Sequence, residues 1–469
     1  MKAPTRPWFL AGVSLALASL LWLLFTAGLT ILRYRMNYAS AYDFGLFSQM
    51  YYYMGKCLLP LTTCERDGLL SHFAVHLSPI FYLLLPLYKL FPRPETLLAA
   101  QALLVASGLI PLCLLGRKLR LGPGATFLFG LIYCAYPAFL GGCFYDFHEN
   151  AFLAPLILWT LYWMECRRFK IMCIFALFIL LVKEDAPVYA ACIGLYLFLG
   201  KRNYPYGAGI FLASCIYFCA AIWYLSHFGD GAMINRFDNY ISDESLGLLG
   251  MFKTILVNPL YVAAQMLTQD KLIFFLQMLL PLGFLPLLTL RWQRWVLLIP
   301  FVLINLMSNY KYQHSILFQY TFGSAPLLFY LAMVNLRDFR LPPLKSFRPL
   351  FLGSGLLCAA ALTLTVGSSK TRYLDYYKKY APKAQKAREL LAQIPTDAAV
   401  RASTFFIPQL SMRDEIYVSH SSHPVDYVVL DLRPGYEKDL SLLLEYYQRQ
   451  GWSKVGAVEQ YVAVLRVPD

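Results

Sequence analysis

Long apolar runs separated by short polar turns dominate the first 367 residues. A helix needs about 20 apolar residues to cross the hydrocarbon core of a bilayer, and several runs reach or approach that length. The pattern therefore predicts a polytopic α-helical membrane protein with about eleven spanning helices. The candidate spans are Trp8–Leu32, Thr96–Leu115, Gly124–Leu140, Ala151–Met164, Ile171–Val182, Ala186–Gly200, Gly207–Leu225, Leu272–Leu290, Trp295–Met307, Ile316–Leu336 and Leu350–Val366.

Two longer segments between spans are expected to lie outside the bilayer. Residues 33–95 form the first, and its stretch His76–Leu90 is apolar but short, with two prolines inside it. We interpret this stretch as a helix lying on the membrane surface. The second segment, residues 226–270, is polar at first and amphipathic around Met251–Leu267. It either covers a site as a lid or simply connects two spans.

Basic residues follow the loops on one side of the predicted bundle. The formal net charge is +14, and these loops hold 16 Lys and Arg against two Asp and Glu. Basic short loops mark the cytoplasmic face, so the charge indicates membrane topology rather than a nucleic-acid surface. The N-terminus is then cytoplasmic, and Trp8–Leu32 is too long for a cleaved signal peptide. The loops counted are residues 1–7, 116–120, 165–170, 201–203, 291–294 and 336–348.

From residue 368 the composition becomes that of a soluble domain. Amphipathic and strand-like segments alternate there, which predicts a small α/β domain over residues 368–469. An odd number of spans that starts from a cytoplasmic N-terminus places this domain on the extracytoplasmic side. The expected helices are Tyr380–Gln393, Phe406–Met412 and Leu440–Gln450, and the expected strands are Ala398–Ser403, Glu415–Ser419, Tyr427–Asp431 and Ala457–Val467.

Cysteines and histidines add few firm assignments. Most of the 11 cysteines lie in apolar runs, where they are small core residues. Cys57 and Cys64 share the first external loop and are candidates for a disulfide. His72 and His76 are four residues apart, a spacing that suits either a shared divalent metal or separate interfacial hydrogen bonds.

Ionisable residues gather where apolar runs end, and their clusters fall on the expected external side. Charge next to hydrocarbon is costly, so such residues are candidates for a functional site. Asp43 follows the first span. It is either a general base at the boundary between water and membrane or a cap for the next helix.

Two further groups of polar residues lie at the external ends of later spans. Asp146, His148 and Glu149 separate the third and fourth spans, and we interpret them as substrate or metal contacts, with helix capping as the alternative for Asp146. Lys311 and His314 precede the tenth span and are candidates for phosphate or sugar contact. Nucleotide-binding and soluble-hydrolase motifs are absent from the sequence.

Lys183, Glu184 and Asp185 interrupt an otherwise apolar stretch. One interpretation is a salt-bridged turn. The other is that Lys183 binds a phosphate as a point charge, with Glu184 or Asp185 orienting it.

Four of these motifs, in order, resemble a bacterial family of predicted membrane proteins known as domain of unknown function 2079. The resemblance covers nearly the whole chain. More distantly, the layout resembles GT-C glycosyltransferases: a first span, an external loop with an acidic residue, a basic turn at Gly116–Leu119, a Lys-containing turn and a terminal soluble domain. The motifs are Tyr42–Gly45, Ser71–Pro79, Asp146–Glu149 and Val182–Asp185, with Ile394–Ala398 and Asp426–Asp431 in the tail.

This resemblance implies a GT-C-like domain over residues 1–367 and an extracytoplasmic domain over 368–469, in the bacterial plasma membrane. It implies an inverting transfer of a sugar from a polyprenyl-phosphate donor to a glycan, lipid or protein acceptor. Asp43 would take the acceptor proton, and Lys183, with Lys311 second, would meet the leaving phosphate. The other His, Asp and Glu residues would hold the sugar or a divalent metal. The chain departs from many relatives in having one acid in its first-loop motif and two extra carboxylates beside Lys183.

Two other classes of protein fit parts of the pattern. A transporter or flippase of a lipid-linked intermediate also carries ionisable groups among its spans, but transporters usually show repeated halves and sites near the midplane. This chain has no evident repeat, and its acids lie at the ends of spans. A non-catalytic membrane scaffold leaves the clustered His, Asp and Glu residues unexplained. The sequence therefore favours the transferase.

Overall fold

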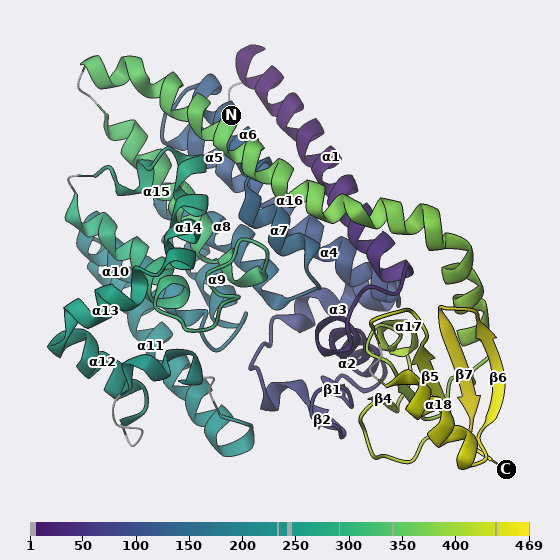
Figure 1. The fold of residues 1–469 in the computed structure, drawn as a ribbon. Helices are drawn as coiled ribbons and strands as arrows, with labels where there is room; N and C mark the ends of the chain where they lie inside the picture. The colour runs from purple at the N-terminus through teal and green to yellow at the C-terminus, as the bar shows by residue number, and fades with distance from the viewer. Residues whose placement is uncertain are drawn as a thin grey trace.

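Two long helices pack together on one side of the protein, which is largely helical (Figure 1). The computed structural model describes residues 6–231, 234–241, 246–289, 291–339, 342–436 and 439–468. Helix α1 (Arg6–Arg35) packs against α16 (Pro342–Leu391), and α16 leads to a small sheet near the C-terminus.

Within the described part of the chain, five helical segments are long and apolar enough to cross a membrane. They are α1, the pairs α4–α5 and α6–α7, α11, and residues 347–391 of α16. The other expected spans form shorter or interrupted helices, so the number eleven stays a prediction. The bounds are α4 (Pro94–Ser107), α5 (Leu109–Lys118), α6 (Pro123–Cys134), α7 (Pro137–Phe144) and α11 (Tyr204–Phe228).

The expected span Leu272–Leu290 shows why some runs are interrupted. Pro281 and Pro286 cannot donate a helical hydrogen bond, and Gly283 has a φ of 56°, in the left-handed region. Helix α14 (Gln269–Leu279) therefore gives way to the short turns η6 (Leu280–Leu282) and η7 (Leu285–Leu287). The remaining elements of this part are α8 (Leu153–Glu165), α9 (Phe169–Leu180), α10 (Pro187–Lys201), η8 (Trp292–Leu298), η9 (Phe301–Leu306), η10 (Gln319–Thr321) and α15 (Ser324–Asp338).

Short elements fill both segments that we expected to lie outside the bilayer. The stretch expected as a surface helix contains α3, which has ten residues. The first segment contains η1 (Ala41–Gly45), α2 (Leu46–Cys57), β1 (Leu61–Thr62), β2 (Leu70–Ser71), η2 (His72–Ala74) and α3 (Phe81–Leu90). The second contains η4 (Ile234–Tyr240), α12 (Leu248–Val257) and α13 (Pro259–Met266).

A five-stranded sheet near the C-terminus has the order β4-β3-β5-β7-β6. Strand β3 pairs in parallel with β4 and β5, whereas β7 is antiparallel to β5 and β6. This confirms the α/β character expected of the tail. The expected domain boundary at residue 368 lies inside α16, because the helix continues unbroken to Leu391. The elements are β3 (Val400–Ala402), α17 (Ile407–Leu410), β4 (Ile416–Val418), β5 (Tyr427–Asp431), α18 (Leu440–Arg449), β6 (Ser453–Val458) and β7 (Val462–Arg466).

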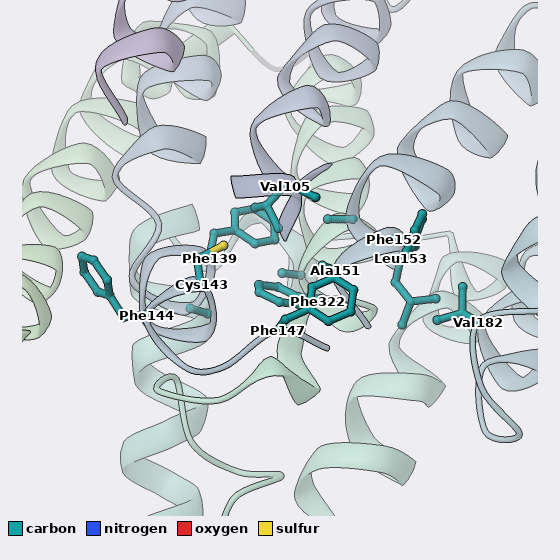
Figure 2. Close-up of a cluster of buried hydrophobic side chains, with 14 of the residues drawn as sticks. Val105, Phe139, Cys143, Phe144, Phe147, Ala151, Phe152, Leu153, Val182 and Phe322 are labelled. Carbon is teal, nitrogen blue, oxygen red and sulfur yellow. The ribbon is translucent and has the colours of Figure 1, made fainter. Parts of the chain in front are cut away.

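Apolar packing holds the turns that carry the candidate polar residues (Figure 2). Phe147 and Phe152, from the turn between α7 and α8, are buried in one cluster with Val182, from the turn between α9 and α10. The ring of Phe322 stacks on that of Phe139 in the same cluster, with centroids 6.3 Å apart. The flanking charged side chains are therefore attached to a closely packed core.

Candidate active site

Asp43 lies in η1, a single π-helical turn between the first span and α2. The N–H of Gly45 donates to the carbonyl of Ser40 at 3.0 Å, which closes this turn. Helix α2 begins after Gly45 without a side-chain cap, so Asp43 does not cap it. Its carboxylate is 28% exposed. Turns of this kind often occur at functional sites.

His148 and Tyr145 hold the carboxylate of Asp43. Nε2 of His148 lies 3.3 Å from Oδ1 of Asp43, and the hydroxyl of Tyr145 donates to Oδ2. Nδ1 of His148 lies 2.9 Å from the carbonyl oxygen of Asp146. A carbonyl and an ionised carboxylate can only accept, so these two partners favour the protonated form of His148, in which both ring nitrogens are donors.

The protonation of this pair follows from two opposing effects. Burial would raise the pKa of Asp43, but its hydrogen bonds to His148 and Tyr145, with the charge of His148, outweigh burial and lower that pKa. Burial would lower the pKa of His148, but the bond to Asp43 raises it. Asp43 is therefore an accessible carboxylate that stays ionised, and His148, whose side chain is 6% exposed, is its buried counter-ion.

Arg33 and Gln101 fix the segment that carries His148. Arg33, at the end of α1, forms a buried ion pair with Asp146. The amide of Gln101 in α4 donates to the carbonyl of Asp146 at 3.1 Å and accepts from the N–H of His148 at 2.9 Å. Asp146 therefore positions the segment through its ion pair. Burial raises the pKa of Asp146 despite Arg33.

A second buried charge cluster lies beside the first. Nζ of Lys183 is 2.9 Å from the carboxylate of Glu149, and both side chains are almost fully buried. Glu184 contacts Nδ1 of His76 at 2.8 Å and accepts from the N–H of Leu77. Lys183 therefore has a carboxylate partner inside the protein, contributed by the segment between α7 and α8.

Two of the acids in this region are harder to ionise than usual. Burial, followed by the charge of Glu184, raises the pKa of Asp185 to about 6. Burial also raises the pKa of Glu184, although Lys183 opposes it. By contrast Lys183 outweighs burial at Glu149, so the pKa of Glu149 lies below its usual value.

The structure places the remaining candidate residues apart from Asp43 or engages them elsewhere. His72 pairs with Glu65 at 2.8 Å, so the two candidate metal-ligand histidines each face a different carboxylate. Among the described residues, no group of three or more His, Cys, Asp and Glu could hold a metal. His314 pairs with Asp270 at 2.9 Å, and Lys311 is exposed beside Tyr312. Cys57 and Cys64 are both free thiols.

An apolar cavity of about 490 Å³ opens beside Glu184 and Asp185. Its walls come mainly from α10, α11 and α12, and its polar end also contains Arg236 and Gln313. The guanidinium of Arg236 lies over the ring of Tyr320, 5.4 Å from the centroid. Phe318, two residues before Tyr320, packs edge-on against Tyr145 with ring centroids 4.7 Å apart, so this segment connects the polar residues of the cavity with the Asp43 cluster.

A family model described as predicted membrane protein (DUF2079) matches residues 33–455. The chain belongs to this family. None of the curated proteins compared with the chain matches it.

Solved structures resemble this family member over its full length. ArnT from Cupriavidus metallidurans bound to undecaprenyl phosphate is 12% identical, with a TM-score of 0.55 and coverage of 97% of both chains. Its apo state is 13% identical, with a TM-score of 0.54 and coverage of 98% and 97%. The arabinofuranosyltransferase AftD from Mycobacteria is 16% identical, with a TM-score of 0.52. The similarity covers 100% of this chain and 40% of the AftD chain. These similarities confirm the expected polytopic helical membrane fold of the GT-C type.

Three residues of the Asp43 cluster were missed by sequence reasoning: Arg33, Gln101 and Tyr145. Arg33 and Gln101 lie in or beside apolar runs, where a polar side chain needs a partner, and that signal was available. Tyr145 precedes Asp146 directly, but tyrosine is so common in this chain that its position gives no distinguishing signal.

Proposed function

We propose that this protein transfers a sugar from a polyprenyl-phosphate donor to an acceptor hydroxyl at the extracytoplasmic face of the bacterial plasma membrane. The observation that carries the proposal is Asp43, an ionised and accessible carboxylate at the open end of a buried polar cluster. The fold supports it, because ArnT has been crystallised with undecaprenyl phosphate and AftD is an arabinofuranosyltransferase.

In the proposed reaction Asp43 takes the proton of the acceptor hydroxyl as the hydroxyl oxygen attacks the anomeric carbon. A new carbon–oxygen bond forms on the face opposite the donor phosphate. The bond between the anomeric carbon and the phosphate oxygen breaks, and the lipid phosphate leaves with the bonding electrons. The anomeric centre is inverted. His148 and Tyr145 each hold one carboxylate oxygen, so the base keeps a fixed orientation and retains lone pairs for the acceptor.

The apolar cavity is the proposed site of the polyprenyl chain. Its lining is mostly apolar, and its polar end carries Arg236 beside Tyr320. A cation at that end stabilises the charge that develops on the leaving phosphate. We therefore assign this role first to Arg236 and second to Lys183, whose Nζ is paired with Glu149.

Among the described residues, no group of three or more His, Cys, Asp and Glu could hold a divalent metal. His72 and His76 each have Nδ1 on a different carboxylate. We derive no step through a metal. We assign the sugar contacts instead to the polar residues between Asp43 and the cavity. Lys311 stays a candidate for a phosphate or sugar contact because it is exposed beside Tyr312.

The test is transfer of a labelled sugar by membranes that contain the full-length protein. Undecaprenyl-phosphate-linked pentoses and hexoses, each labelled in the sugar, serve as donors, and the membranes supply acceptors. We expect incorporation with at least one donor, and a loss of at least about 100-fold in Asp43→Asn because general base catalysis contributes about that much. The control is Glu445→Gln, which makes the same change at a 56% exposed carboxylate. Equal incorporation by wild type and Asp43→Asn would remove Asp43 from the role of base.

A further inference from the structure

The C-terminal domain is docked on the loop that carries Asp43 (Figure 1). The amide of Gln49 in α2 donates to the carbonyl oxygens of Arg413 and Asp414 at 3.2 and 3.0 Å. The hydroxyl of Thr63 donates to the carbonyl of Ile416 at 2.5 Å. Gln49 and Thr63 are buried. The two parts of the chain thus share a polar, water-excluding interface.

One hydrogen bond in this interface acts directly on the turn that holds Asp43. The first N–H groups of a helical turn have no partner inside it and need a cap. Ser40 precedes the turn but makes no side-chain cap bond. Instead the N–H of Ala41 donates to Oγ1 of Thr404, at 3.2 Å and 363 residues further along the chain. The cap of this turn therefore belongs to the C-terminal domain.

The other end of the same turn is also in contact with that domain. Gly45 has an ordinary helical backbone, with φ −62° and ψ −46°, so its conformation does not require glycine. A Cβ at this position would come within 2.8 Å of Cγ2 of Ile407, which is fully buried. The absence of a side chain at Gly45 is what lets Ile407 reach the turn.

We infer that the C-terminal domain positions Asp43, with Thr404 capping the first residue of its turn and Ile407 packing on the last. This inference rests on the proposed function, in which Asp43 is the base. Thr404 and Ile407 are positioning residues, since they act on Asp43 through the backbone of residues 41–45. A base must lie within hydrogen-bond reach of the proton it takes, and small displacements of a reacting group cost much of the rate. The domain is thus part of the active site, although it supplies none of the reacting groups.

The first test measures the turn itself, without reference to activity. Hydrogen exchange is followed in peptides that cover residues 38–47 of the full-length protein in wild type, Thr404→Val and Thr404→Ser. Valine keeps the shape but cannot accept a hydrogen bond, and serine keeps the acceptor. We expect exchange at residues 41–45 to become at least about tenfold faster in Thr404→Val, and to be restored in Thr404→Ser. Unchanged exchange in Thr404→Val would overturn the positioning role.

Transfer kinetics in the same variants connect the turn to the chemistry. We expect kcat to fall on the order of tenfold in Thr404→Val with KM unchanged, and to recover in Thr404→Ser. The control is Lys56→Gln, which removes an exposed ion pair with Asp414 in the same interface and leaves the turn untouched. An equal loss of kcat in Lys56→Gln would show that any weakening of domain docking lowers activity, and would overturn the specific role of the turn. If exchange is faster in Thr404→Val but neither wild type nor any variant shows transfer activity, the proposed function is wrong. The role of Thr404 in holding the turn then still stands.

A compensating pair of substitutions tests the second contact. Gly45→Ala should displace Ile407 and lower kcat, and Gly45→Ala with Ile407→Ala should recover most of the loss because the added Cβ then has room. Gly55→Ala, in helix α2, is the matched control, because the nearest atom to its added Cβ is at an ordinary 3.9 Å. Equal activity of Gly45→Ala and Gly55→Ala would contradict the contact.

Discussion

Replacing Lys183 by methionine separates its structural role from a catalytic one. The side chains of Lys183 and Glu149 are 4% and 1% exposed, and their charged atoms are 2.9 Å apart. Methionine is similar in length to lysine but uncharged. The variant therefore leaves the carboxylate of Glu149 buried without its partner, which is the costly event, because the attraction within a buried pair mainly offsets desolvation.

The expected size follows from that burial. Removing one partner of a buried ion pair costs about 3–5 kcal/mol. With an unfolding entropy of about 2.1 cal/mol/K per residue, a chain of this length loses about 1 °C of Tm for each kcal/mol. The melting temperature of Lys183→Met should therefore fall by about 3–5 °C. Replacing both partners, in Lys183→Met with Glu149→Leu, should recover most of the loss because neither charge is then left unpaired.

Thermal melts of the detergent-solubilised protein, followed by tryptophan fluorescence, measure these differences. The control is Arg449→Met, which breaks an exposed pair with Glu445 and should shift Tm by at most about 1 °C. A double variant that melts as low as Lys183→Met, or a single variant that melts like wild type, refutes the pairing argument. Activity lost by the double variant at a wild-type Tm would then indicate a direct role of Lys183 toward the phosphate.

Three more predictions concern the Asp43 cluster and its side of the membrane. Tyr145→Phe removes a hydroxyl that lowers the pKa of Asp43, so the acid limb of the transfer rate should move to higher pH; a profile like that of wild type would contradict this. Because the pKa of His148 is raised above 6.5, the stabilisation from its pair with Asp43 is complete below pH 6.5 and is lost as pH rises through the raised value. The wild-type Tm should therefore fall more over that range than the Tm of His148→Gln, and parallel curves would count against the ion pair. In right-side-out vesicles a membrane-impermeant maleimide should label Cys57 and not Cys166, in variants that each keep one cysteine; reversed labelling would invert the proposed topology.

Hydrophobic patterning was sufficient to predict the fold class and the small α/β region at the C-terminus. Expected strands at 398–403, 415–419 and 427–431 became β3, β4 and β5, because β-branched and aromatic runs bounded by turns have few alternatives. The pattern was less informative where Pro281, Gly283 and Pro286 interrupt an apolar run. The pattern also predicted a domain boundary near residue 368, where the composition changes. The backbone of α16 continues through this position as one helix.

The candidate site could be predicted as a set of residues but not as a set of pairs. The clustering of ionisable groups at the ends of spans indicated Asp43, His148 and Lys183. Which acid meets which cation depends on tertiary packing, so the pairing of Asp43 with His148 could not be derived from spacing. The contact of Thr404 with Ala41 joins segments 363 residues apart, and nothing local to either segment indicates it.

We predict that a lipid phosphate binds at the end of the bundle that carries Asp43. The most direct measurement is a structure of the protein with undecaprenyl phosphate. We predict the chain in the cavity between α10, α11 and α12, and the phosphate at the end marked by Arg236 and Tyr320. A phosphate at the opposite end of α1, beside Trp8 and Arg117, would place the lipid headgroup about 40 Å from Asp43, since a helix rises about 1.5 Å per residue. That result would contradict sugar transfer at this site.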